Sequence, residues 1–158
     1  MPAIGTLDVD AAVAAAPHVL GSDTPRWDLP DATLVQVNWE IADAPALDLT
    51  PPACHPSIPP YASFFGGRYP ESPVGAFSLA QVRIVVRAGI RPRAVCLGAV
   101  CDNAAAVEVL RSVWGFPVVH GDVEVSARHD RTLVAASIAG RDVIEMCCHG
   151  SRPSEAAT

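Results

Sequence analysis

Residues 66–117 read GGRYPESPVGAFSLAQVRIVVRAGIRPRAVCLGAVCDNAAAVEVLRSVWGFP, and this stretch decides the fold. Apolar and polar side chains alternate through residues 77–87, which is the period of a β-strand with two different faces. Residues 93–100 are apolar almost throughout and predict a second, buried strand. The turn signal Gly89 to Pro92 separates the two strands, so we expect them to pair as neighbours.

A helix follows these strands. Val107, Leu110 and Trp114 recur at the i, i+3, i+7 spacing of one buried stripe, which predicts a helix over residues 104–114. Asp102 or Asn103 can cap its N-terminus, and we favour Asp102. Gly115 and the nearby proline supply the stop signal.

Outside this centre the sequence predicts more strands and few helices. Pro-dense residues 42–60 are expected to form an extended loop with neither helix nor sheet pairing, and Gly66-Gly67 to form a turn. Further strands are predicted at 33–41, 61–65, 123–127, 132–138 and 141–148. The expected class is α+β: a mainly antiparallel sheet or partial barrel with one principal helix.

The chain organisation predicted from these patterns is a single domain. Residues 1–32 are expected to be a weakly ordered leader, 33–150 the domain, and 151–158 a flexible tail. Half of the 158 residues are apolar, which suits a globular domain with a real core.

Composition excludes several functional classes. The net charge of −6 argues against a nucleic-acid partner, and no apolar run is long enough to span a membrane. No secretory signal is visible and the five cysteines form no C-x-x-C pair, so we expect a cytoplasmic protein. No His, Cys or carboxylate group has metal-ligand spacing and no glycine-rich phosphate loop is present, so neither a metal nor another cofactor is expected.

All eleven basic residues are arginine, so the chain has no lysine. No side-chain amine is therefore available to form a Schiff base with a carbonyl substrate.

The order of several motifs resembles the acetoacetate decarboxylase superfamily over residues 33–143. The matching motifs are the proline-rich approach at 51–56, the Tyr69-Pro70-Glu71-Ser72 turn, the central strand pair, the helix that leads into Trp114-Gly115-Phe116-Pro117, and Gly121-Asp122-Val123. The resemblance implies a β-rich, cone-like fold that encloses a pocket for a β-keto acid.

The resemblance also implies roles for individual residues. In this family a lysine before the Gly-aromatic-Pro turn forms the Schiff base and a neighbouring lysine tunes its pKa, but here Ser112 and Val113 stand at those positions. Glu71 matches the pocket glutamate and is the predicted catalytic acid or base. Arg111, next to the lost lysine, keeps its proton and cannot act as an amine nucleophile.

Arginines on one face of a strand suit a carboxylate ligand. Arg83 and Arg87 share a face of strand 77–87, so both are predicted to bind substrate through bidentate contacts, with solvent-facing arginines as the alternative. Substrate contacts are also predicted for Arg111, Ser112, Tyr69 and His55, the last because the proline-rich loop can border the pocket.

Besides ordinary decarboxylation with an amine from elsewhere, which the missing lysine disfavours, two classes of function remain open. The first is a lyase-like enzyme acting on a small oxo acid by acid/base chemistry without a Schiff base, such as hydration, dehydration, enolisation or cyclisation in specialised metabolism. The alternative is a non-catalytic subunit that binds a ligand or completes another chain's barrel. Because family chains run considerably further, we expect a homo-oligomer or a partner chain to cover the open sheet edge.

Overall fold

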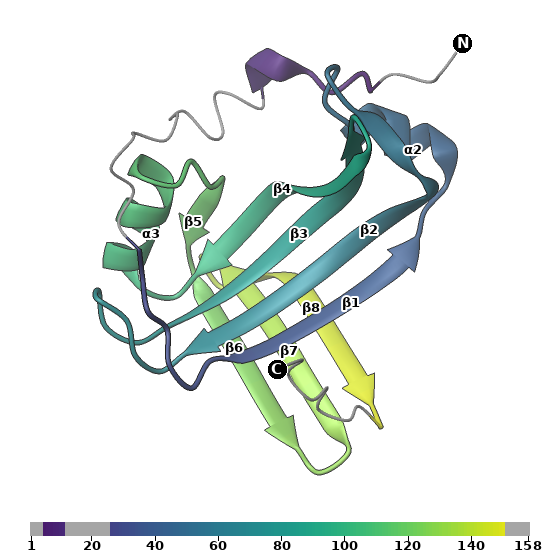
Figure 1. The fold of residues 1–158 in the computed structure, drawn as a ribbon. Helices are drawn as coiled ribbons and strands as arrows, with labels where there is room; N and C mark the ends of the chain where they lie inside the picture. Colours follow the sequence, from purple (N-terminus) through teal and green to yellow (C-terminus); the bar gives the residue numbers. More distant parts are fainter. Residues whose placement is uncertain (1–4, 12–25, 151–158) are drawn as a thin grey trace.

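The computed structural model describes residues 5–11 and 26–150. Two sheets form the molecule (Figure 1): a five-stranded sheet in the order β1-β2-β3-β4-β5 and a three-stranded sheet in the order β6-β7-β8. The strands are β1 (Thr33–Glu40), β2 (His55–Tyr69), β3 (Phe77–Ala88), β4 (Arg91–Cys101), β5 (Val118–His120), β6 (Asp122–Arg128), β7 (Arg131–Ile138) and β8 (Arg141–His149). Neighbours are antiparallel except β4 and β5, which run parallel. This confirms the expected mainly antiparallel class.

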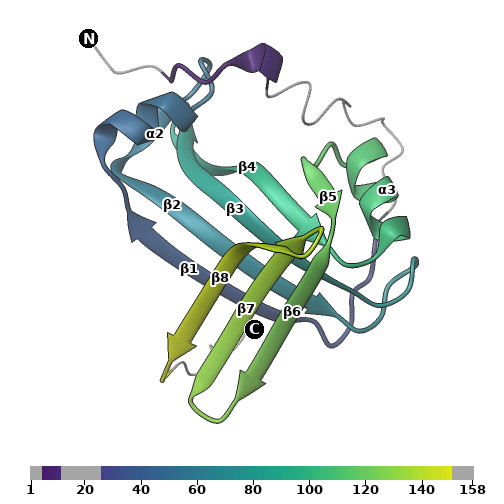
Figure 2. The same ribbon diagram turned by 180° about the vertical axis from the view of Figure 1, so that it is seen from behind.

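The two faces of the larger sheet are covered differently. Helix α3 (Ala104–Ser112) lies on one face beside β5, and the smaller sheet lies across the opposite face (Figures 1 and 2). Each face has its own core. Helix α3 buries Ala106 and Leu110 against Phe77 and Leu79 of β3, whereas the two sheets meet through Phe64, Ala80, Val100, Val134 and Ala136.

Helix α3 matches its predicted position but not its predicted cap. Asn103 is the N-cap, and its side-chain oxygen accepts from the backbone N–H groups of Ala105 and Ala106 at 2.9 and 3.1 Å. The favoured Asp102 is instead bound to the neighbouring strand, where its carboxylate accepts from the Ser78 N–H at 2.6 Å. The helix ends two residues early, and Gly115 adopts the left-handed conformation (φ +65°) typical of a helix stop.

The prediction that residues 42–60 hold neither helix nor sheet was wrong. Helix α2 (Asp43–Leu49) occupies the first part, because Pro45 falls in its first turn, where a backbone N–H has no helical partner to lose. The start of β2 also lies here, since Pro56 pairs with Val86. The prolines that follow occupy a register break before Tyr61, where no backbone N–H is needed for pairing with β3.

The predicted Gly66-Gly67 turn was wrong as well, because both glycines lie inside β2. A Cβ on Gly66 would lie 2.7 Å from Val134 of the smaller sheet, and one on Gly67 would lie 2.7 Å from the Tyr69 hydroxyl. These glycines therefore serve close packing, on opposite faces of one strand, rather than a change of direction.

The predicted leader falls partly within the described residues. The backbone N–H groups of Gly5, Thr6 and Leu7 donate to carbonyls in and after α2. Trp27 and Leu29 pack against the core beneath α3. The remainder of the leader and the predicted tail lie outside the described residues. In the described part, no helix is long and apolar enough to cross a membrane.

Candidate ligand-binding site

Arg83 occupies the centre of the face that carries α3. It lies in the middle of β3 and pairs with Ser63 of β2 on one side and Cys96 of β4 on the other. Side chains alternate along a strand, so Gln81 and Phe65 share its face two residues away. We call Ser63, Phe65, Gln81, Arg83 and Cys96 the Arg83 cluster.

Two contacts hold the Arg83 guanidinium in place. Its Nε donates to Oε1 of Gln81 at 2.8 Å, and its central carbon lies 4.4 Å from the centroid of the Phe65 ring. Gln81 and Phe65 are both buried. A guanidinium held by one N–H and stacked on a ring keeps a fork of further N–H groups for a ligand. Within the described residues, no carboxylate forms an ion pair with it.

Tyr69 lies farther along the same face. Its ring stacks on Phe77 with centroids 4.6 Å apart, and its hydroxyl folds back over Gly67 toward the Arg83 cluster. Burial raises the pKa of the Tyr69 phenol, and the positive charge of Arg83 opposes part of that increase. The phenol therefore stays protonated and can donate a hydrogen bond.

An apolar cavity of about 600 Å³ adjoins the cluster at Cys96. It lies between residues 7–11, β4 and the turn 114–117, where Trp114 forms part of its wall. The Cys96 thiol donates to the Gly98 carbonyl at 3.6 Å, and burial raises its pKa, so it remains a thiol at neutral pH.

Two buried polar atoms near this region lack hydrogen-bond partners in the described part of the protein: the Ser63 hydroxyl oxygen and Trp114 Nε1. Because an unpaired buried polar group costs free energy, native proteins retain few of them. Both atoms therefore have unused hydrogen-bonding capacity.

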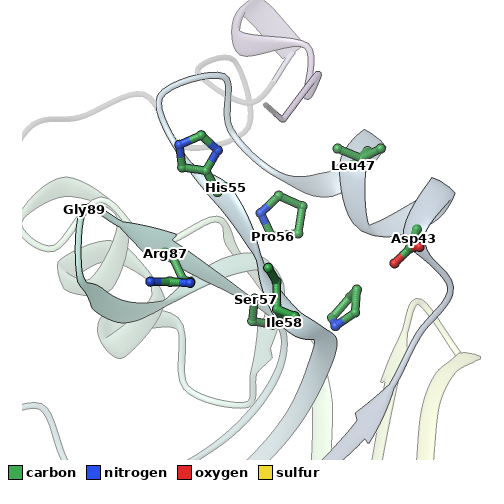
Figure 3. A pocket seen from close by; sticks show the side chains of 9 residues that line it. Asp43, Leu47, His55, Pro56, Ser57, Ile58, Arg87 and Gly89 are labelled. Carbon is green, nitrogen blue, oxygen red and sulfur yellow. The ribbon is translucent and has the colours of Figure 1, made fainter. Parts of the chain in front are cut away.

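Arg87 and His55, which were predicted to share the pocket with Arg83, border a different cavity (Figure 3). His55 of β2 and Arg87 of β3 are paired in the strand register. This second cavity measures about 590 Å³, and Asp43 and Leu47 of α2 form its other wall. Arg87 is exposed, whereas Arg83 is half-buried.

Three other predicted residues make contacts that do not reach the Arg83 cluster. Arg111 donates to the Val118 carbonyl at 2.9 Å and so ties α3 to β5. Ser112 is exposed and donates back to the Glu108 carbonyl at 2.7 Å. Glu71 is exposed in the turn after β2, and a strand rise of about 3.3 Å per residue places that turn more than about 20 Å along the sheet from Ser63.

The sequence interpretation missed Gln81, Phe65 and Ser63. The period-two alternation that placed Arg83 on one face of its strand also places Gln81 there. Phe65 and Ser63 lay within a predicted strand, but their pairing with β3 depends on register, which local pattern alone does not provide. Cys96 was expected only as a buried thiol.

Comparison with known proteins returned solved structures alone: no family model and no curated protein sequence matches this chain. Acetoacetate decarboxylase from Legionella pneumophila subsp. pneumophila str. Philadelphia 1 superimposes with a TM-score of 0.74 at 18% sequence identity, over 89% of this chain and 57% of that one.

The chain has the acetoacetate decarboxylase fold. An acetoacetate decarboxylase-like enzyme from Sphingomonas wittichii RW1 superimposes with a TM-score of 0.66 at 14% identity, over 79% of this chain and 58% of that one. The enduracididine biosynthesis enzyme MppR gives 0.63 at 19% identity, over 80% and 57%. The chain therefore spans a little over half the length of these structures, and the expected fold resemblance is confirmed.

Proposed function

We propose that this chain is an acetoacetate decarboxylase-like enzyme that binds a small oxo acid on the α3 face of its larger sheet. The observation that carries the proposal is the Arg83 guanidinium, which Gln81 and Phe65 fix in place beside an apolar cavity. One structure of MppR, a protein of this fold, is a complex with pyruvate, which is an oxo acid of this class.

In this proposal Arg83 binds the substrate carboxylate through its remaining N–H groups. The Ser63 hydroxyl, which has no partner in the described part of the chain, adds a further hydrogen bond. The Tyr69 phenol, on the same face, donates to the oxo oxygen and stabilises negative charge there, as an enol or enolate requires. In this proposal no Schiff base forms, since no side chain of this lysine-free chain supplies an amine.

Two residues are candidates for the group that transfers the proton. Tyr69 lies on the Arg83 face, and Glu71 lies two residues later in an exposed turn. The geometry favours Tyr69, whereas the resemblance favours Glu71. Tyr69→Phe and Glu71→Gln therefore decide between them, because each removes the proton-transfer group and keeps the shape.

The test is enolisation measured directly. Pyruvate, acetoacetate and longer 2-oxo acids are incubated with the protein in D₂O, and NMR follows deuterium incorporation next to the carbonyl while calorimetry measures binding. We expect Arg83→Met to lower affinity about tenfold or more, since a charge-assisted hydrogen bond contributes about 1.5–3 kcal/mol. Arg87→Met, four residues along the same strand, is the matched control and should leave affinity unchanged.

A second candidate is a subunit that binds the oxo acid without turnover and completes a barrel with another chain. It is supported by β1, which pairs only with β2 in the described part of the chain and exposes Leu34 and Trp39. Unpaired sheet edges are usually covered. Binding without deuterium incorporation, together with a dimer or larger assembly in analytical ultracentrifugation, would favour this candidate. If Arg83→Met and Arg87→Met both bound the oxo acid as the wild type does, both candidate functions would be contradicted.

A further inference from the structure

A cysteine, a histidine and an arginine meet on the outer face of the smaller sheet, which lies in front in Figure 2. The Cys147 sulfur in β8 accepts from Arg131 Nε at 3.1 Å and lies 3.4 Å from His149 Nε2. Strand geometry explains the meeting. Cys147 and His149 are two residues apart on one face, and Arg131 pairs with His149 across the ladder.

These contacts matter because the nucleophilic form of cysteine is the thiolate. A guanidinium N–H directed at the sulfur stabilises negative charge on it, and an adjacent imidazole can take up the thiol proton. Cys147 is also exposed, so a reagent can reach it.

A shallow hollow of about 200 Å³ begins beside Arg131. Glu124, Ser126, Arg128 and Leu133 complete its lining. It thus carries two guanidinium groups and one carboxylate, and one of the guanidinium groups also contacts the Cys147 sulfur. This charge balance favours an anionic molecule next to the thiol.

We propose that Cys147 is a nucleophilic thiol that forms a mixed disulfide with small anionic disulfides. The Cys147 proton passes to His149 Nε2, and the sulfur attacks one sulfur of the reagent. A new S–S bond forms as the reagent's own S–S bond breaks, and the departing thiolate takes a proton. Arg128 and Arg131 hold the reagent's carboxylates. The product is one mixed disulfide and one free thiol, with no other oxidant required.

The remaining cysteines have different surroundings. Cys148 lies on the opposite, inward side of β8 and is half-buried. Cys54 and Cys96, elsewhere in the chain, are also half-buried, and Cys101 is fully buried. Burial raises the pKa values of Cys96 and Cys101, which disfavours their thiolates. Reaction should therefore begin at Cys147.

The experiment compares three small disulfides on the folded chain: oxidised glutathione (anionic), hydroxyethyl disulfide (neutral) and cystamine (cationic). Intact mass and peptide mapping follow each cysteine over time. We expect Cys147 to react first, and about tenfold faster with glutathione disulfide than with cystamine, since complementary charge accelerates association by about tenfold or more. Modification of Cys54 or Cys148 at the same rate, or equal rates with all three reagents, would overturn the proposal.

Variants separate the two parts of the site. Arg128→Gln should reduce the preference for the anionic reagent, because Arg131 alone then holds its carboxylates, and should slow glutathione disulfide more than hydroxyethyl disulfide. Arg131→Gln and His149→Gln should slow all three reagents, because both side chains act on the sulfur itself. Unchanged rates in both of these variants would show that Cys147 reacts only because it is exposed. Circular dichroism before reaction verifies that each variant is folded.

Discussion

The two faces of the larger sheet carry different kinds of side chain. The face toward the smaller sheet presents Phe64, Ala80 and Val100, and its closest approach is at Gly66, where Val134 occupies the space of a side chain. The face toward α3 begins with the same kind of aromatic and aliphatic packing. Farther along the same strands it carries Gln81, Arg83 and Ser63, whose hydroxyl has no hydrogen-bond partner among the described residues.

This difference separates a face built for packing from the face on which we propose that an oxo acid binds. Apolar side chains that meet across two sheets stabilise the fold in proportion to the area that they bury. A buried hydroxyl without a partner costs about 1–3 kcal/mol. Stability alone would replace Ser63 with an apolar residue, so its presence beside Arg83 supports a binding role for the α3 face.

The largest expected effect tests the packed face. Gly66→Val should destabilise the protein by about 3 kcal/mol or more, because the new side chain would overlap Val134 between two rigid sheets. Gly98→Ala is the control, since a Cβ at Gly98 meets nothing within 4 Å. Urea unfolding measures both. If Gly66→Val unfolded at the wild-type urea concentration, the two sheets would not be in contact at this point.

The second prediction uses pH to probe the apolar part of the α3 face. Burial raises the pKa of Cys101 to about 11, so the folded state holds this proton more tightly than the unfolded state does. Stability is therefore complete below the unfolded pKa and should fall by about 2 kcal/mol between pH 9 and 11. Burial also raises the pKa values of Tyr69 and Cys96, so urea unfolding against pH is compared with a Cys101 variant to isolate the Cys101 part of the loss.

Cys101→Ala is the control for the alkaline loss. The variant should be less stable at pH 7, because it removes buried volume, but its stability should fall less steeply above pH 9. An unchanged slope would mean that Cys101 is solvated.

The third prediction concerns the end of α3. The Asn103 side chain caps the helix and also donates to the carbonyls of Val74 and Ala76 at 3.2 and 3.0 Å. Asn103→Ala should therefore cost about 1.5 kcal/mol, and Asn103→Asp, which keeps the cap and loses the two donors, about half of that. Thermal unfolding of both variants measures the two parts separately. Equal losses would assign the whole effect to the donors.

The smallest expected effect gives the sharpest contrast between stability and binding. Ser63→Ala should change the free energy of unfolding by less than about 0.5 kcal/mol, or raise it, because its hydroxyl has no partner to lose. Ser57→Ala is the matched control on the same strand. The Ser57 hydroxyl accepts from the Tyr61 N–H at 3.1 Å, so its removal should cost about 1 kcal/mol. Calorimetry should show weaker oxo-acid binding in Ser63→Ala alone.

Short-range periodicity determined much of this fold. The period-two pattern predicted β3, an apolar run predicted β4, and the apolar stripe predicted α3, and the strands of the smaller sheet were also predicted close to their observed limits. These features depend on residues two to four apart, which a chain specifies through its own local geometry. The motif order that resembles acetoacetate decarboxylase likewise indicated the fold that the structure confirms. The absence of lysine, and with it of a side-chain amine that could form a Schiff base, is also a property of the sequence alone.

The tertiary structure decided what local pattern could not. Gly66 and Gly67 resemble a turn until Val134 and the Tyr69 ring are seen to occupy the space beside them. The period-two pattern places Arg83 and Arg87 on the same face of β3. Arg83 lies over the Phe65 ring, however, whereas Arg87 borders the cavity next to α2. Register between strands and the placement of covering elements depend on contacts between residues far apart in the chain. These contacts separate the half-buried arginine that we propose to bind the ligand from an exposed one.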